Sequence, residues 1–269
     1  MEEGEINENS NGVFTNIQSR LNNTELKKNH EEAFLSVKQK IWSLDWYFKV
    51  IQGFNPADNN IMTDPGVIAS TSKQQIDQIS GLTTSSGTVT ISSSILSEKD
   101  KLFLINLLFD GFVWNAKSVL DCFAHEVRCI FSLGGYSQKR KLHIDDLPNI
   151  LKNNHKDRLL AKLLKDIKQK DWYKELNKFR DITTHKNVIP KEIEYTTTER
   201  TSVSSSISRI KTREGKIFLR ENPDYENSRE IDLKIFVEGV YNEIKDLIND
   251  SYNAIDRDIE KEKNLPLNN

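Results

Sequence analysis

One long segment constrains the fold most. From Leu96 the chain reads LSEKDKLFLINLLFDGFVWNAKSVLDCFAHEVRCIFSLGG, and only the glycine pair at its end stops a helical pattern. Apolar side chains occupy most of the helical circumference, which is typical of a helix that is central in a core or lies at a subunit interface. Four polar residues interrupt the segment and need partners, in either a structural or a catalytic role, of which the structural one is favoured: Asp110, Asn115, Asp121 and His125.

Five further segments have the three- and four-residue apolar spacing of amphipathic helices. They are residues 31–51, about 146–153, about 156–169, 171 to about 185, and 231 to about 262. The sequence therefore predicts a mainly α protein, a bundle of four to five main helices.

The remaining segments differ in composition. Residues 52–96 contain a Ser/Thr-rich run and are predicted to be a loop excursion. Residues 192–220 alternate in polarity and are rich in Thr, Val and Ile, which predicts a small β-hairpin insertion with its turn at Glu214-Gly215. We expect a single helical domain over 26–262, flanked by flexible segments at 1–25 and 263–269.

Composition indicates a soluble globular protein. The chain has 36% hydrophobic and 29% charged residues, and no run approaches the roughly 18 apolar residues of a membrane span. Its N-terminus is acidic and polar, unlike a secretory signal, so we expect a cytoplasmic protein with no membrane partner. Cys122 and Cys129 are seven residues apart on one helix, about 10 Å, which is too far for a disulfide.

Positive charge is concentrated in one part of the chain. The net charge is −2, which argues against a constitutive nucleic-acid coat. Lys152–Lys186 nevertheless holds 11 Lys and Arg against 5 Asp and Glu. This stretch is either a set of solvated helix faces or a surface that binds an acidic partner.

A short motif lies at the end of this basic stretch. FRDITTHKN, residues 179–187, places Arg180, Asp181 and His185 just before Pro190, which no helix continues through. Asp181 and His185 are one helical turn apart, close enough for the carboxylate to orient the imidazole. Asp181 is equally placed to pair with Arg180. A third interpretation is a solvated helix end in which His185 complements the helix dipole.

Arg180, Asp181 and His185 match in order the arginine, polar residue and histidine of the R-polar-x-x-x-H motif, so the chain resembles the HEPN superfamily over roughly residues 30–260. The resemblance implies metal-independent RNA cleavage without a cofactor, a toxin or defence role, and an antitoxin or other protein partner. Arg180 would bind phosphate and His185 would transfer the proton. The alternative is a catalytically inactive HEPN-like module that binds RNA, a nucleotide or a protein.

The spacing of the motif raises a geometric question. Residues five apart on an ideal helix point about 140° from each other, so Arg180 and His185 of one straight helix do not converge on one phosphate. Either the last helical turn unwinds, or two chains pair and share one cleft. The resemblance favours the second arrangement and predicts a homodimer.

A rival motif, HEVRC, lies in the central segment. His125, Glu126 and Cys129 imitate the H-E-x-x-H zinc signature with Cys in place of the second histidine. No third ligand has a helpful spacing. We therefore expect core packing of Cys122, His125 and Cys129, and no metal site.

Overall fold

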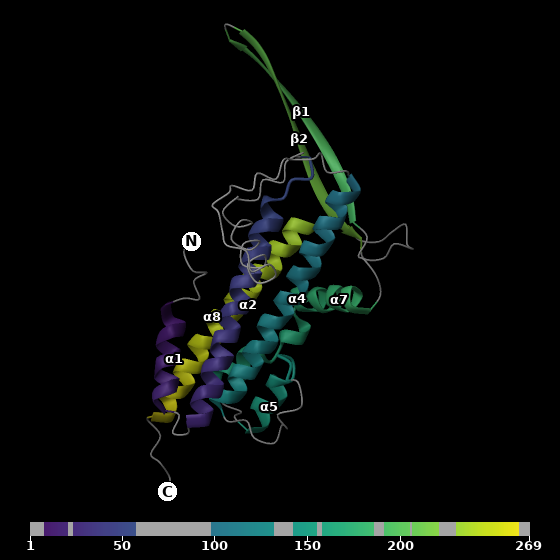
Figure 1. Ribbon diagram of the computed structural model, residues 1–269. Helices are drawn as coiled ribbons and strands as arrows, with labels where there is room; N and C mark the ends of the chain where they lie inside the picture. The colour runs from purple at the N-terminus through teal and green to yellow at the C-terminus, as the bar shows by residue number, and fades with distance from the viewer. Residues whose placement is uncertain are drawn as a thin grey trace, which may run out of the picture. The chain divides into compact units, whose positions relative to one another are not determined.

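The computed structural model describes residues 8–20, 24–57, 98–131, 142–154, 158–185, 191–204, 206–220 and 230–263. Within these residues the helices are α1 (Glu8–Arg20), α2 (Thr24–Gly53), α4 (Glu98–Ile130), α5 (Leu147–Asn154), α6 (Leu159–Leu164), the 3₁₀ helix η1 (Ile167–Gln169), α7 (Asp171–His185) and α8 (Leu233–Lys263). The strands are β1 (Lys191–Ser204), β2 (Ser206–Arg220) and β3 (Glu230–Asp232). The predicted mainly α class with a small antiparallel insertion is confirmed (Figure 1).

The chain divides into two compact units. The helical unit comprises 1–48, 110–188 and 237–269, and the hairpin unit comprises 49–109 and 189–236. The boundaries fall inside the long helices α2, α4 and α8. Residues 58–96 of the predicted loop excursion lie outside the described residues.

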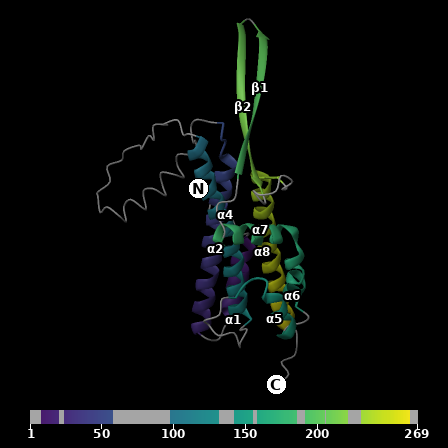
Figure 2. The same ribbon diagram turned by 90° about the vertical axis from the view of Figure 1, so that its right-hand side faces the viewer.

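Four helices of the helical unit run side by side: α1, α2, α4 and α8 (Figures 1 and 2). Their core follows the predicted periodicity. Phe34, Val37, Ile41 and Leu44 of α2 are all buried, and the ring of Phe34 meets the edge of Tyr252 from α8 at 6.3 Å between centroids. The amphipathic pattern therefore identifies the inward face of α2 correctly.

The N-terminal segment differs from its expected flexible state. Residues Glu8–Arg20 form α1, where Val13 and Ile17 are buried. The ring of Phe14 stacks on Phe34 at 4.5 Å and on His30 at 5.2 Å between centroids. These few apolar side chains among many polar ones are enough to pack the helix against α2, although the overall composition resembles that of a flexible segment.

Contrary to the expectation from the sequence, one helix, α4, has the length and composition of a membrane span. Lys99–Ile130 has a mean hydropathy of 1.2 in an 18-residue window of which 44% is buried. The central helix of a soluble core has the same composition. Phe112, Val113, Ala116 and Val119 of α4 are completely buried in the helical unit.

The helix α6 is capped from a distant part of the chain. Asp258 of α8 is buried, and its carboxylate accepts hydrogen bonds from the backbone amides of Leu159 at 2.8 Å and Leu160 at 3.2 Å. These two amides begin α6 and have no partner within it. One carboxylate therefore joins α6 to α8 and also complements the positive end of α6.

In the hairpin unit, β1 and β2 pair antiparallel from Lys191↔Leu219 to Ser204↔Ser206. The predicted turn at Glu214-Gly215 is wrong, because Gly215 lies inside β2 opposite Tyr195. Its amide donates to Asn55 Oδ1 at 3.3 Å, and a side chain at this position would collide with the Pro56 ring. The glycine thus permits a close approach of two segments, a role that a local turn signal does not reveal.

Candidate functional site

Arg180 lies near the end of α7 with its guanidinium 5.5 Å from the centroid of the Trp114 ring on α4. Its Nη1 donates to Asp181 Oδ1 at 3.2 Å, so the structure shows one of the two alternatives for Asp181, its pair with Arg180. Arg180 Nε is buried and has no hydrogen-bond partner among the described residues. Trp114 is 43% exposed. A cation beside an open aromatic face is an arrangement that suits a phosphate and a base.

The backbone of α7 excludes one of the two arrangements considered for Arg180 and His185, the unwound last helical turn. The helix is continuous through His185, and the hydroxyls of Thr183 and Thr184 donate to the Arg180 carbonyl at 3.0 and 2.7 Å. Positions 180 and 185 therefore remain about 140° apart around the helix axis. The last turn does not unwind in this chain. The side chain of His185 is outside the described residues, so its expected pairing with Asp181 stays a prediction.

A buried cation lies beside Arg180, one helical turn from Trp114 on α4. Lys117 Nζ donates to Tyr173 Oη at 2.6 Å and sits 4.4 Å from the centroid of that ring. Burial lowers the pKa of Lys117, the charge of Asp121 opposes this, and the nearby charge of Arg180 adds to it. Burial also raises the pKa of Tyr173. The hydrogen bond therefore joins a buried phenol to a buried amine and ties α4 to α7.

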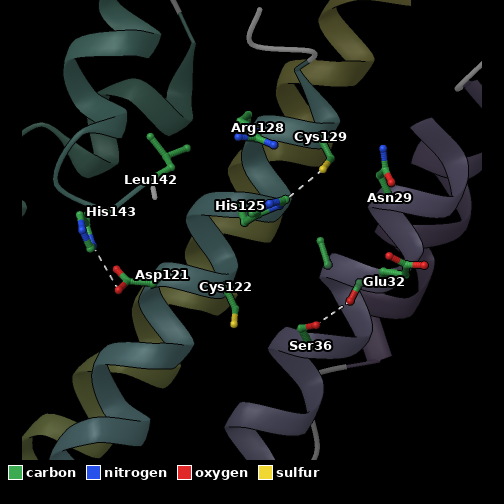
Figure 3. A pocket seen from close by; sticks show the side chains of 11 residues that line it. Asn29, Glu32, Ser36, Asp121, Cys122, His125, Arg128, Cys129, Leu142 and His143 are labelled. Atoms are coloured by element: carbon green, nitrogen blue, oxygen red, sulfur yellow. Dashed lines mark hydrogen bonds and ion pairs between the residues drawn. The ribbon is translucent and has the colours of Figure 1, made fainter. Parts of the chain in front are cut away.

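A pocket of about 580 Å³ opens over α4 in the helical unit. Figure 3 shows α2 on one side of it and the segment that carries Leu142 and His143 on the other. We call it the α4 pocket; its lining residues are Asn29, Glu32, Ala33, Ser36, Asp121, Cys122, His125, Arg128, Cys129, Leu142 and His143.

An aspartate–histidine pair forms one edge of the α4 pocket. His143 Nδ1 lies 3.2 Å from Asp121 Oδ2, and the two side chains are 43% and 31% exposed. A carboxylate acceptor fixes the tautomer that carries the proton on Nδ1. The backbone of His143 is also held, because its amide donates to Asp146 Oδ2 at 3.3 Å and its carbonyl accepts from the Asp146 amide at 3.0 Å. The imidazole is therefore oriented before any ligand arrives.

A second imidazole and a guanidinium line the same pocket. His125 is exposed, and its Nδ1 is 3.8 Å from Cys129 Sγ. Partial burial and the neighbouring charge of Arg128 hold the pKa of His125 below its ordinary value of 6.5, so this imidazole is neutral at pH 7. Burial raises the pKa of both Cys122 and Cys129, which leaves both thiols protonated. The pocket thus contains a neutral imidazole beside a fixed cation.

The HEVRC segment does not form a zinc site within the described part of the chain. Among those residues no group of three His, Cys, Asp or Glu side chains is placed to hold a metal ion. Glu126 turns away from His125 into the core, where it is fully buried. Its Oε2 accepts from Tyr252 Oη at 2.7 Å, and its Oε1 is 3.4 Å from His30 Nε2. The glutamate that imitates a catalytic base is therefore a core group.

No protein-family model matches the chain, and neither a curated protein nor a solved structure shows significant similarity to it. Sequence reasoning interpreted Asp121 as structural and did not consider His143. These residues are 22 positions apart, and only the fold brings them together. No short motif signals such a pair.

Proposed function

We propose that this protein is a metal-independent endoribonuclease of HEPN type that acts in the cytoplasm as a homodimer. Arg180 binds the phosphate, and His185 moves the proton. The observation that supports this best is the environment of Arg180: a partly exposed guanidinium beside the open Trp114 ring, with Nε unpartnered among the described residues. The local excess of Lys and Arg over 152–186 provides a field that attracts RNA.

The chemistry requires few groups. The 2′-hydroxyl of RNA gives up its proton to a base and attacks the adjacent phosphorus. The bond from phosphorus to the 5′-oxygen breaks, and an acid protonates that oxygen. A guanidinium stabilises the negative charge that develops on the phosphoryl oxygens. Asp181 pairs with Arg180 in the free protein, so a phosphate has to compete with this carboxylate or join it on another nitrogen of the guanidinium.

The continuity of α7 supports the proposed dimer. Positions 180 and 185 of one helix diverge by about 140°, so a single chain does not direct both at one phosphate. Pairing two chains through the ends of α7 brings Arg180 of one protomer toward His185 of its partner. Molar mass by light scattering should therefore give two chains, and mixed dimers of Arg180→Ala and His185→Ala protomers should regain part of the activity.

The decisive assay is RNA cleavage in excess chelator. The wild type should cleave, and His185→Ala should lose about 10²–10⁴-fold in rate, the contribution of a positioned proton-transfer group. Lys28→Gln is the matched control, because it removes an exposed cation outside the basic stretch, from α2, where Lys28 pairs with Glu32 at 3.8 Å. Circular dichroism and molar mass should be unchanged in both variants.

One observation favours a second function. The 3.2 Å pair between Arg180 and Asp181 already neutralises the guanidinium, as expected if this helix end only holds a partner. In that case the protein is a catalytically silent HEPN-like module that binds RNA, a nucleotide or a protein such as an antitoxin. Absence of cleavage by the wild type, together with loss of the dimer in His185→Ala, supports this second function.

A further inference from the structure

Trp114 is an exposed aromatic side chain beside the guanidinium that the proposed function assigns to phosphate. We infer that this indole is the stacking platform for one unpaired base, and that the substrate of the site is single-stranded RNA. The inference rests on the proposed function, because Arg180 supplies the phosphate contact. It adds the strandedness of the substrate and the residue that determines it.

The first step of the argument is the contact between the indole and the guanidinium. Arg180 Cζ lies over the Trp114 ring at 5.5 Å from its centroid, and Trp114 is still 43% exposed. Stacked aromatic rings have centroids about 4.5–7 Å apart, so a base on the exposed surface of the indole lies close to Arg180. A base on Trp114 and a phosphate on Arg180 therefore belong to the same nucleotide or to adjacent ones.

The second step separates Trp114 from other exposed aromatic residues. Exposure alone does not distinguish it, because Trp42 of α2 is 54% exposed. Among the described residues, however, Trp114 has a cation over its ring and Trp42 has none. Arg180 also belongs to the stretch 152–186, in which 11 Lys and Arg outnumber 5 Asp and Glu. A ligand that suits both features is a polyanion with flat apolar faces, as a single strand of RNA is.

The third step concerns the support of the indole. Its neighbours on α4, Val113 and Ala116, are completely buried. A second contact joins α4 to α7, since Lys117 Nζ donates to Tyr173 Oη at 2.6 Å and both residues are buried. The helices that carry the indole and the guanidinium are therefore held together before a ligand binds. A platform of this kind loses little conformational entropy when a base stacks on it.

A second aromatic ring borders the preceding turn of α4. Gly111 lies three residues before Trp114, about 4.5 Å along the helix axis. The Tyr47 ring of α2 approaches Gly111 so closely that an added Cβ would be 2.6 Å from Tyr47 Oη. Tyr47 is half-buried, so part of this ring is open as well. Aromatic rings interleaved with a cation are typical of surfaces that bind single strands.

Stacking on Trp114 requires a base with a free face. In a duplex each base lies between its neighbours, whereas the bases of loops, bulges and ends are unstacked and reach aromatic side chains. Every base has a π-face, so the platform accepts all four bases. The site therefore selects unpaired RNA and does not select one base at this position.

Binding is measured with a 2′-O-methyl tetranucleotide, which has no nucleophile, and with a chain of the same charge that lacks the bases. The wild type should bind the strand with bases about 5–150-fold more tightly, the contribution of one stacked base. Trp114→Leu should lose most of this preference, and Trp114→Phe, which keeps a flat ring, should retain most of it. Trp42→Leu is the matched control, because it removes an exposed indole from α2 and should leave the preference unchanged. Circular dichroism should be unchanged in all three variants.

Strandedness is tested by competition with a blunt-ended duplex of the same sequence. The duplex should bind more weakly than the single strand to the wild type, and Trp114→Leu should not weaken its binding. In cleavage assays Trp114→Leu should raise KM with little change in kcat, as expected when binding alone is lost. A wild type that cleaves RNA, with Trp114→Leu equal to it in KM and in the preference for bases, overturns the inference and leaves the proposed function standing. A wild type that cleaves no RNA but loses its preference for bases in Trp114→Leu refutes the nuclease and supports the platform.

Discussion

Replacement of Glu126 by Gln gives a direct test of the buried contacts in the helical unit. The carboxylate is fully buried between His30 of α2 and Tyr252 of α8, with Oε2 2.7 Å from Tyr252 Oη and Oε1 3.4 Å from His30 Nε2. Burial raises the pKa of Glu126 above its ordinary value of 4.5, although the contacts with His30 and Tyr252 act in the opposite direction. Glutamine keeps the shape and cannot ionise.

The raised pKa of Glu126 determines how the stability changes with pH. The folded state holds the Glu126 proton more tightly than the unfolded state, so the favourable contribution is complete below pH 4.5 and is lost as pH rises through the folded pKa. Each pH unit within this window removes at most about 1.4 kcal/mol from the free energy of unfolding. Glu126→Gln should therefore become more stable relative to the wild type as pH rises, up to the folded pKa.

Urea unfolding at several pH values, with Glu243→Gln as an exposed control, measures the difference. Tyr252→Phe completes the design, because it keeps the ring contacts with Phe34 and Phe123 and removes only the hydroxyl. It should cost about 1.5–3 kcal/mol when the carboxylate is charged, and about 1 kcal/mol in the Glu126→Gln background. A stability difference between Glu126→Gln and wild type that stays constant from pH 4 to pH 8 would refute the reasoning.

Three further predictions follow from single contacts. Asp258→Ala should lower the free energy of unfolding by about 2 kcal/mol, because two amides of α6 lose their cap, and chemical denaturation measures this. Gly111→Ala should cost about 1–3 kcal/mol, since the added methyl group would lie 2.6 Å from Tyr47 Oη, and Tyr47→Leu should recover part of the loss in the double variant. Lys117→Met should cost about 0.5–1.5 kcal/mol in the same assay, because it removes the 2.6 Å hydrogen bond to the Tyr173 hydroxyl, and an unchanged stability argues against that contact.

The spacing of apolar residues predicts the helices, because residues that are close in sequence form the face through which each helix packs. The apolar spacing of α2 and α8 identifies the faces that become buried, and the first residue of α7 agrees with the predicted start at Asp171. The hairpin turn was misplaced because the role of Gly215 depends on Asn55 and Pro56, which are about 160 positions away in sequence. A glycine has the same local signature in a turn and at a close contact.

The candidate sites also contain some contacts that the sequence predicts and others that only the tertiary fold brings about. Arg180 and Asp181 are neighbours in the chain, so their pairing was open to sequence reasoning as one of two alternatives. Lys117 and Tyr173 are 56 positions apart and come from different helices, and the Asp121–His143 pair likewise requires the tertiary fold. A polar residue on an apolar helix predicts that a partner exists, without saying which one.

The two candidate sites share one face of α4, and Lys117 lies between them. Trp114 and Asp121 are seven residues apart, so the Arg180 end and the His143 end are separated by about 10 Å along the helix. The charges of Asp121 and Arg180 both act on Lys117, in opposite directions, and its Nζ is already bonded to Tyr173. Its hydrogen bond therefore lies within the protein, and Lys117 makes no direct contact with a ligand at either end.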